Sequence, residues 1–173
     1  VAIVTGGASG IGQAVAEVFA EADLAGLVIA DVEGAEEAAA DIKGRFATDA
    51  VGIATDISDS AQVGAMVDEA VKRFYRIDIL VNNAGIGPMV DWEDVTEENW
   101  RQVMDVNLNG ALYCTLAVLP TMRRQNAGRI VNISSVGAFT GSVTAPPAYG
   151  VAKAGMIAMT KSAAKEFATD GIL

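Results

Sequence analysis

The chain has 173 residues, of which 51% are hydrophobic, and it carries a formal net charge of −10 with no histidine. The acidic balance argues against nucleic-acid and anionic membrane partners, and no apolar run approaches the roughly 20 residues of a membrane span. Without histidine, Ser-His-Asp and Cys-His nucleophilic schemes and HExxH zinc sites are excluded, so we expect no metal site, and acid/base chemistry falls to Tyr, Lys, Asp or Glu.

Short aliphatic runs alternate with amphipathic stretches along the chain. The aliphatic runs predict strands buried on both faces of a sheet, at residues 1–5, 26–31, 50–56, 77–85 and 128–135. The amphipathic stretches predict helices at residues 11–22, 33–46, 60–74 after a Ser58/Asp59 cap, 97–125 and 148–170. In the longest helix the spacing places Met104, Leu108, Leu112, Thr115 and Leu119 on one face. Such alternation implies right-handed βαβ units, so we assign the chain to the α/β class with a doubly wound parallel sheet.

The remaining stretches bear on domain organisation. Residues 141–148, GSVTAPPA, are the best loop prediction, because two prolines cannot lie inside a helix or a central strand. No linker or repeat interrupts the pattern, so residues 1–173 are predicted to form one domain of about the usual size. The chain starts inside a strand-like run and stops at Leu173 where another strand would begin, so we expect a longer protein whose C-terminal strands are absent here. The single cysteine, Cys114, predicts a buried apolar side chain, compatible with the cytoplasmic location that we expect.

A glycine-rich turn follows the first predicted strand. In TGGASGIG, Gly6, Gly10 and Gly12 open the first helix, and glycine leaves no Cβ between the backbone and a ligand. A pyrophosphate can therefore approach the N–H groups at the helix N-terminus, although a tight turn with incidental glycines is the alternative. The second strand ends in Asp31, whose carboxylate can accept hydrogen bonds from both adenosine ribose hydroxyls and would repel a 2′-phosphate. This fingerprint predicts dinucleotide binding, with NAD (NAD+/NADH) preferred over NADP.

Further motifs follow in a fixed order. NNAG lies at residues 82–85, ISS at 133–135 and YGVAK at 149–153. With the Gly-x3-Gly-x-Gly spacing, the whole chain resembles the compact, non-extended subfamily of the short-chain dehydrogenase/reductase family, which has a Rossmann fold. The resemblance implies four catalytic residues, Asn107, Ser135, Tyr149 and Lys153. It implies a cofactor site formed by Gly6, Ser9, Gly10, Ile11, Gly12, Asp31, Asp56, Ile57, Asn83, Ala84, Gly85, Tyr149 and Lys153.

In this scheme Tyr149 is the acid/base, Lys153 is its partner and binds the nicotinamide ribose, and Ser135 holds the substrate oxygen. Asn107 anchors a water in the proton relay, and Asp56 meets the adenine amino group. Each has an alternative role: Tyr149 and Lys153 could be a surface pair one helical turn apart, Asp56 a turn residue, and Asn107 a helix breaker. Strand alternation separates Ser134 from Ser135, and the motif favours Ser135. Asn82 and Asn83 are expected to satisfy backbone groups at a strand end.

The chemistry also explains the residue types. Hydride transfer to a carbonyl leaves an alkoxide that needs a proton, and without histidine a tyrosine must have its pKa lowered by a neighbouring ammonium. We therefore predict an NAD(H)-dependent enzyme that interconverts a secondary alcohol and a ketone. The alternatives are reduction of a 3-oxoacyl thioester on an acyl carrier, usually with NADPH, and a non-catalytic dinucleotide-binding module. By resemblance we expect a homo-oligomer, a tetramer or a dimer, and apolar helix faces suit such packing.

Overall fold

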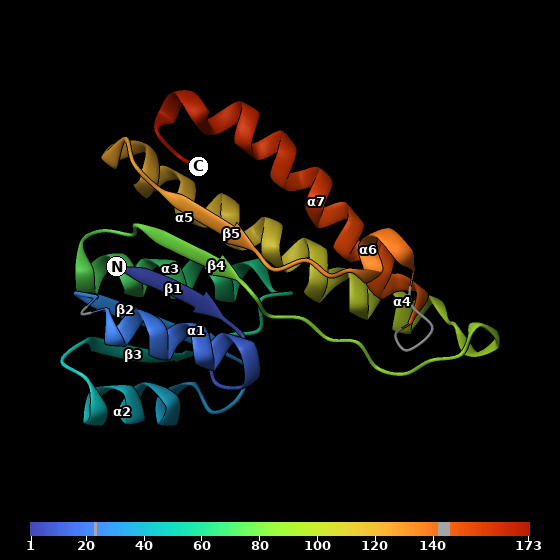
Figure 1. Ribbon diagram of the computed structural model, residues 1–173, viewed down its shortest axis with the longest axis horizontal. Coiled ribbons are helices and arrows are strands. Elements are labelled where there is room, and N and C mark those ends of the chain that lie inside the picture. Colours follow the sequence, from blue (N-terminus) through green and yellow to red (C-terminus); the bar gives the residue numbers. More distant parts are fainter. Residues whose placement is uncertain (23, 142–145) are drawn as a thin grey trace.

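The computed structural model describes residues 1–22, 24–141 and 146–173. Within these residues, strands form one parallel sheet in the order β3-β2-β1-β4-β5 (Figure 1). Their bounds are Ala2–Thr5 for β1, Gly26–Asp31 for β2, Asp49–Ala54 for β3, Ile79–Asn82 for β4 and Arg129–Asn132 for β5. The chain starts in the middle of the sheet and reverses its direction of winding between β1 and β4. This arrangement confirms the predicted doubly wound α/β fold, and such reversal points are where ligands bind in open parallel sheets.

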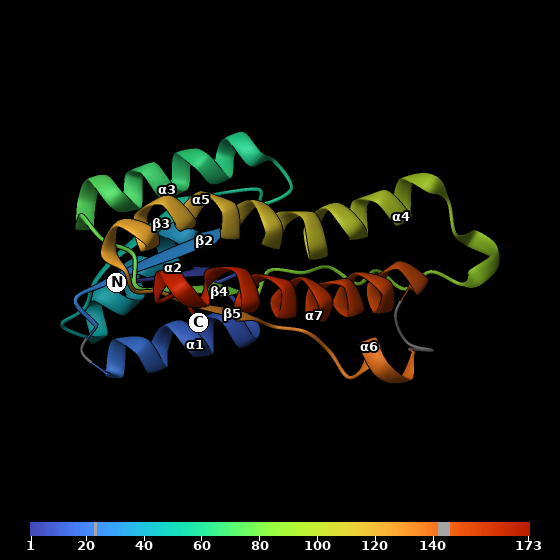
Figure 2. The same cartoon turned by 90° about the horizontal axis from the view of Figure 1, so that it is seen from above.

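Helices cover both faces of the sheet. They are α1 (Gly10–Glu21), α2 (Ala35–Arg45), α3 (Ser60–Phe74), α4 (Glu97–Met104), α5 (Ala111–Gln125), α6 (Gly137–Thr140) and α7 (Pro147–Phe167). Short turns of other helix types are η1 (Trp92–Asp94), η2 (Asp105–Gly110) and η3 (Ala168–Asp170). Figure 2 shows the sheet between α1 on one side and α3 and α5 on the other. Helix α7 packs against β5, α4 and η2.

The apolar strands explain why the sheet is covered twice. In β1, Ile3 packs with Met66 of α3 and Met122 of α5, whereas Val4 packs on the opposite face with Ala16 of α1. All five side chains are buried. Because neighbouring strand residues point to opposite faces, a continuous apolar run requires helices on both sides.

Strands β4 and β5 are shorter than predicted. The predicted runs 77–85 and 128–135 end in the structure at Asn82 and Asn132. The motif residues beyond these points leave the sheet and line cavities at its carboxyl edge. The alternation argument that separated Ser134 from Ser135 is therefore wrong, because neither residue lies in a strand.

The predicted helix 97–125 contains a change of helix type. Residues 105–110 form the π-helical segment η2 between α4 and α5. A wider turn rotates the following residues relative to a regular α-helix. The predicted face is therefore only partly right: Thr115 and Leu119 are buried, but Leu112 is 37% exposed. Asn107 lies inside this segment, and the helix continues beyond it.

The predicted loop 141–148 is partly outside the described residues, which omit 142–145. Pro146 caps α7, and Pro147 is its first residue, so the helix begins one residue earlier than predicted. A proline is accommodated there because the first N–H of a helix needs no intrahelical partner. At α3, the predicted cap is confirmed, since the Asp59 side chain accepts hydrogen bonds from the N–H groups of Ala61 and Gln62.

No helix in the described part of the chain has the length and apolar character needed to cross a membrane.

Candidate active site

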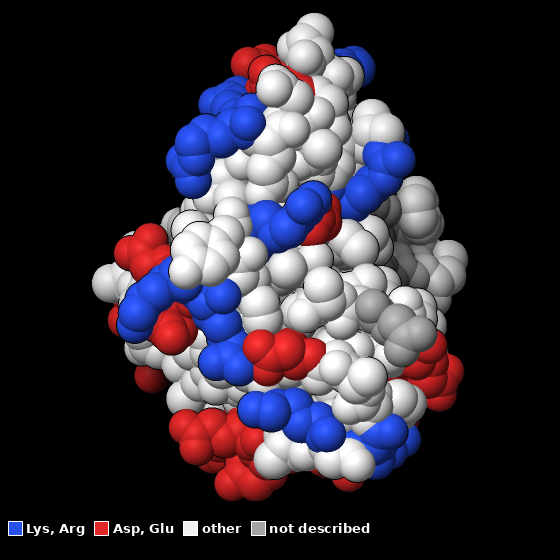
Figure 3. Space-filling model, turned by 90° about the vertical axis from the view of Figure 1, so that its left-hand side faces the viewer, with Lys and Arg blue, Asp and Glu red and all other residues white. Residues whose placement is uncertain are grey.

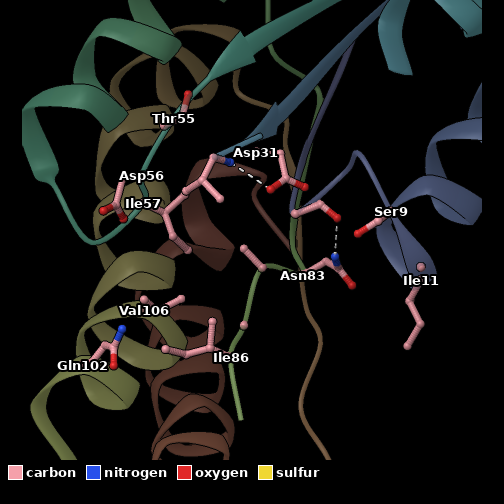
Figure 4. A pocket seen from close by; sticks show the side chains of 15 residues that line it. Ser9, Ile11, Asp31, Thr55, Asp56, Ile57, Asn83, Ile86, Gln102 and Val106 are labelled. Carbon is pink, nitrogen blue, oxygen red and sulfur yellow. Dashed lines mark hydrogen bonds between the residues drawn. The ribbon is translucent and has the colours of Figure 1, made fainter. Parts of the chain in front are cut away.

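A cavity of about 530 Å³ lies at the carboxyl edge of the sheet, around the point where the winding reverses (Figure 4). It collects residues from the ends of β1, β2, β3 and β4. Most of the predicted cofactor residues line it: Gly6, Ser9, Gly10, Ile11, Asp31, Asp56, Ile57, Asn83, Ala84 and Gly85. Among the described residues that line this cavity there is no Lys or Arg.

The glycine turn is packed too closely for side chains. A Cβ on Gly12 would lie 2.0 Å from the Gly6 carbonyl oxygen, and one on Gly6 would lie 2.8 Å from the Ala84 Cα. Gly6 and Gly10 also have positive φ, at 60° and 54°. Gly12 itself does not line the cavity, so its part is to let the turn fold tightly against the first turn of α1.

Asp31 joins the glycine turn to the end of β2. Its Oδ2 accepts a hydrogen bond of 3.0 Å from Ala8 N–H, and its Oδ1 accepts one of 2.8 Å from Val32 N–H. Figure 4 shows its side chain between the turn that carries Ser9 and the end of β3. A carboxylate has about four acceptor positions, so both oxygens keep lone pairs for a ligand.

Asp56 is a turn residue that also lines the cavity. Its Oδ1 accepts hydrogen bonds from the Ser58 N–H at 2.9 Å and the Ser58 hydroxyl at 2.7 Å. The two readings of Asp56, as a turn residue and as a ligand contact, are therefore compatible.

Asn83 and Thr5 hold the glycine turn against the end of β4. The Asn83 Nδ2 donates to the carbonyl oxygens of Thr5 and Gly6, both at 3.0 Å. The buried Thr5 hydroxyl accepts from the N–H groups of Asn83 and Ala84, both at 3.1 Å. Asn83 therefore satisfies backbone groups at a strand end, as expected. Sequence reasoning missed Thr5, although it directly precedes the glycine turn.

A second cavity, of about 710 Å³, adjoins the first and shares Ile11, Asn83, Gly85 and Ile86 with it. Ser135, Tyr149 and Lys153 all line this cavity. Ser134 lines it as well, but its hydroxyl donates to the Lys153 carbonyl oxygen at 2.9 Å. The Ser135 hydroxyl accepts from the Gly137 N–H at 3.2 Å. The Ser135 oxygen can still donate, which favours Ser135 over Ser134 as the group that meets a ligand.

Lys153 is buried beside Tyr149. The residue is only 3% exposed, and its Nζ donates to the Ile133 carbonyl oxygen at 2.7 Å. The Nζ lies 5.8 Å from the centre of the Tyr149 ring. Burial lowers the pKa of Lys153 from its ordinary value, because a low-dielectric environment disfavours the ammonium form. Tyr149 and Lys153 are therefore not a surface pair.

Asn107 lies behind both cavities rather than in their walls. Its Nδ2 donates to the Ile86 carbonyl oxygen and its Oδ1 accepts from the Ile86 N–H, each at 2.7 Å. A Cβ on Gly85 would come within 3.1 Å of Asn107 Oδ1 and 3.5 Å of Lys153 Nζ, so Gly85 brings these two side chains together. The π-helical turn of η2 points Asn107 at this backbone, and such turns are frequent at functional sites.

Several cavity residues were not predicted. Val32 directly follows Asp31, and Ile86 and Gly87 are the two residues after the NNAG motif, so the motifs could have indicated all three. Gln102 and Val106 come from α4 and η2 and carry no signal in the sequence, because only packing brings this helix to the cavity.

Charges are distributed unevenly over the molecule. On the side opposite the cavities, Lys and Arg lie among Asp and Glu (Figure 3), and several of them form ion pairs. The last turns of α2, α3, α5 and α7 hold Lys43, Arg45, Lys72, Arg73, Arg123, Arg124 and Lys165. The first turns of α2 and α4 hold Glu36, Glu37, Glu97 and Glu98. Helices run opposite to the strands they connect, so the cavity side is the more acidic one.

The fold and the two adjoining cavities define a doubly wound α/β protein with its site at the carboxyl edge of the sheet. The family model of the short chain dehydrogenases matches residues 1–173. The chain therefore belongs to the short-chain dehydrogenase/reductase family, whose members are oxidoreductases that generally bind nicotinamide dinucleotides.

Curated relatives match nearly all of the chain. The oxidoreductase UcpA of Salmonella typhimurium is 40% identical over 99% of this chain, which spans 65% of that relative. The 3-oxoacyl-[acyl-carrier-protein] reductase FabG of Staphylococcus aureus is 39% identical, and the chain spans 70% of it. A cis-4-hydroxycyclohexanecarboxylate dehydrogenase of Sinomonas cyclohexanicum is 38% identical, with 69% spanned. The chain thus corresponds to about two thirds of these proteins.

Proposed function

We propose that residues 1–173 form a single dinucleotide-binding domain of an NAD(H)-dependent dehydrogenase that interconverts a secondary alcohol and a ketone. One observation carries the proposal: Ser135, Tyr149 and Lys153 line a cavity that adjoins the one reached by Asp31 and the glycine turn. Two adjoining cavities suit a ligand with two nucleotide halves. The close-packed glycines and the carboxylate fit the adenosine half, and the hydroxyl and amine groups fit the reacting half.

The chain's own residues would position and protonate the substrate. The Ser135 hydroxyl orients the substrate oxygen, and the Tyr149 phenol gives it a proton during reduction or takes one during oxidation. The Lys153 ammonium favours the phenolate by electrostatic attraction. Asn107 holds the Ile86 backbone beside Lys153 and would anchor a water behind it. The nicotinamide cofactor, when bound, supplies or accepts the hydride.

Turnover of the full chain tests this function directly. We expect NAD-dependent absorbance at 340 nm with at least one member of a panel of secondary alcohols. Tyr149→Phe should keep NADH affinity and lower kcat by about 100-fold or more, the usual share of a positioned acid/base group. Cofactor binding without turnover on any alcohol or ketone would contradict the enzyme and favour the non-catalytic module, and a fully active Tyr149→Phe variant would contradict the assigned acid/base.

The preference for NAD rests on Asp31 and the acidic cavity side. A 2′-phosphate would meet the Asp31 carboxylate with no Lys or Arg among the described lining residues. We expect NADH to bind at least about tenfold more tightly than NADPH, a difference of about 1.4 kcal/mol. Asp31→Ser should reduce this ratio. Equal affinities for the two cofactors in the unmodified protein would contradict the preference.

Reduction of a 3-oxoacyl thioester is the second candidate function, because the staphylococcal relative carries that activity in its name. The acidic first turns of α2 and α4 disfavour an anionic carrier at the cavity side. Incubation with a 3-oxoacyl thioester and either NADH or NADPH separates the two candidates.

The proposal extends to assembly and location. Leu112 and Leu116 of α5 and Val151 of α7 are exposed apolar side chains that suit a homo-oligomer, which light scattering of the full chain would detect. The single cysteine, a buried free thiol, supports a cytoplasmic location.

A further inference from the structure

Two asparagine side chains, Asn82 and Asn132, connect the ends of β4 and β5 with the helices α5 and α7 that lie beside the candidate site. Asn82 and Asn132 are register partners on the neighbouring strands β4 and β5. The Asn82 Nδ2 donates to the Asn132 Oδ1 at 2.8 Å, so the side chains pair as the backbones do. Neither residue lines the two cavities described above, so neither is placed to touch a ligand bound in them. Asn132 and Thr160 line a separate, small cavity of about 40 Å³ beside α7.

Asn82 also reaches the helix that carries Asn107. Its Nδ2 lies 3.2 Å from the Thr115 hydroxyl and 3.3 Å from the Ala111 carbonyl oxygen. Ala111 directly follows η2, the segment that contains Asn107. Three acceptors around one amide nitrogen fix the orientation of the Asn82 side chain. Its Oδ1 is buried and accepts no hydrogen bond from the described residues.

Asn132 continues the link to the helix that carries Tyr149 and Lys153. Its Nδ2 donates to the Thr160 hydroxyl at 2.8 Å, and that hydroxyl donates to the Met156 carbonyl oxygen at 2.7 Å. Thr160 follows Lys153 by seven residues, about two helical turns, so both lie on the same face of α7. The Lys153 Nζ donates to the carbonyl oxygen of Ile133, the residue directly after β5. The Thr160 hydroxyl accepts from Asn132, the last residue of β5. Helix α7 is thus attached to residues 132–133 at two points along its length.

We propose that the chain of side chains Asn82, Asn132 and Thr160 is a positioning device for the reaction. It fixes α7 along its axis relative to η2, so that Tyr149 and Lys153 face Ser135 and Asn107. The inference rests on the proposed function, since it assigns a role to residues that act through the catalytic ones. A displacement of about 1 Å between reacting groups can lower a rate by about 100-fold, so a small shift of α7 would be visible in turnover.

A pair of substitutions at Thr160 tests the device. Thr160→Val keeps the shape and removes the hydroxyl, whereas Thr160→Ser keeps the hydroxyl. We expect Thr160→Val to lower kcat by about tenfold with KM for NAD changed less than about twofold, and Thr160→Ser to stay within about threefold of the unmodified protein. Thr48→Val is the control, because the Thr48 hydroxyl, like that of Thr160, donates to a carbonyl oxygen, that of Ala20, and lies away from the cavities. Thr48 is buried whereas Thr160 is half-buried, so the control is at least as demanding for stability.

The control separates positioning from stability. A kcat of Thr160→Val within about twofold of the unmodified protein would overturn the proposal, and so would an equal fall in Thr48→Val at equal loss of thermal stability.

A spectroscopic measurement separates this proposal from the proposed function. In protein labelled with ¹³C in the tyrosine rings, Tyr149→Phe identifies the Tyr149 signals. We expect these signals to move in Thr160→Val and to return in Thr160→Ser, while those of Tyr75 stay in place. This result in a protein without turnover would support the positioning device and contradict the dehydrogenase. Unmoved Tyr149 signals in an active enzyme would overturn the device alone.

Discussion

A methyl group at Gly12 should disrupt the glycine turn and with it the cofactor site. An added Cβ would lie 2.0 Å from the Gly6 carbonyl oxygen and 2.5 Å from the Asn83 Nδ2. Ordinary contacts between such atoms are near 3.5 Å, so the turn or the first turn of α1 must move by more than about 1 Å. That movement also breaks the 3.0 Å hydrogen bond from Asn83 to Gly6.

The expected cost of Gly12→Ala follows from these contacts. Overpacking costs about 1–3 kcal/mol, and the lost hydrogen bond adds about 1 kcal/mol. Alanine's higher helix propensity offsets up to about 1 kcal/mol. The free energy of unfolding should therefore fall by about 1–4 kcal/mol, which lowers Tm by about 2–16 °C in a protein of this size.

Thermal unfolding and NADH fluorescence titration measure the two consequences. Gly64→Ala is the control, because Gly64 lies inside α3 and a Cβ there meets no atom within 4 Å. It should raise the free energy of unfolding by up to about 1 kcal/mol through helix propensity and leave NADH binding unchanged. A Gly12→Ala variant with unchanged Tm and unchanged NADH affinity would refute the steric reasoning.

Two further predictions concern titratable groups. Hydrogen bonds from the Ala61 N–H and then from Gln62 lower the pKa of Asp59, so its stabilisation of α3 is complete above the ordinary aspartate pKa and is lost as the pH falls through the lowered value. The Tm of the unmodified protein should exceed that of Asp59→Asn at pH 7, and the difference should shrink below about pH 4; a constant difference in differential scanning fluorimetry would contradict this. Burial raises the pKa of Cys114 to about 12, so a thiol reagent at pH 8 should label it only as fast as the protein unfolds, whereas rapid labelling of the native state would show that the thiol is accessible.

The local pattern of residues was sufficient for the fold class. Buried strands need apolar residues on both faces, and a glycine turn needs residues without a Cβ, so both leave their mark on consecutive positions. The helix cap at Asp59 and the carboxylate at the end of β2 could also be predicted, because each depends on residues next to it in the chain. Asp31 was therefore correctly expected at a cavity, beside the glycine turn that it contacts through Ala8.

Other features depended on contacts between distant parts of the chain. Residues after Asn82 and Asn132 were predicted to continue the strands, but in the structure they leave the sheet. The pairing of β4 with β5 ends at these two residues, and the residues that follow line the two cavities. The π-helical turn at Asn107 depends on the Ile86 backbone, 21 residues away, to which that side chain bonds.

The sequence by itself determined the class of fold, the family, and the residue types available for proton transfer, because each of these is written in short runs of the chain. Only the tertiary structure decided that Lys153 is buried, that Ser134 is occupied by the Lys153 carbonyl oxygen, and that Asn82, Asn132 and Thr160 join three elements behind the site. The physical reason is that the ends of parallel strands meet at one edge of the sheet, whatever their separation in the chain. The shape of a cavity at that edge depends on how the helices pack against one another, and short sequence patterns do not predict that packing.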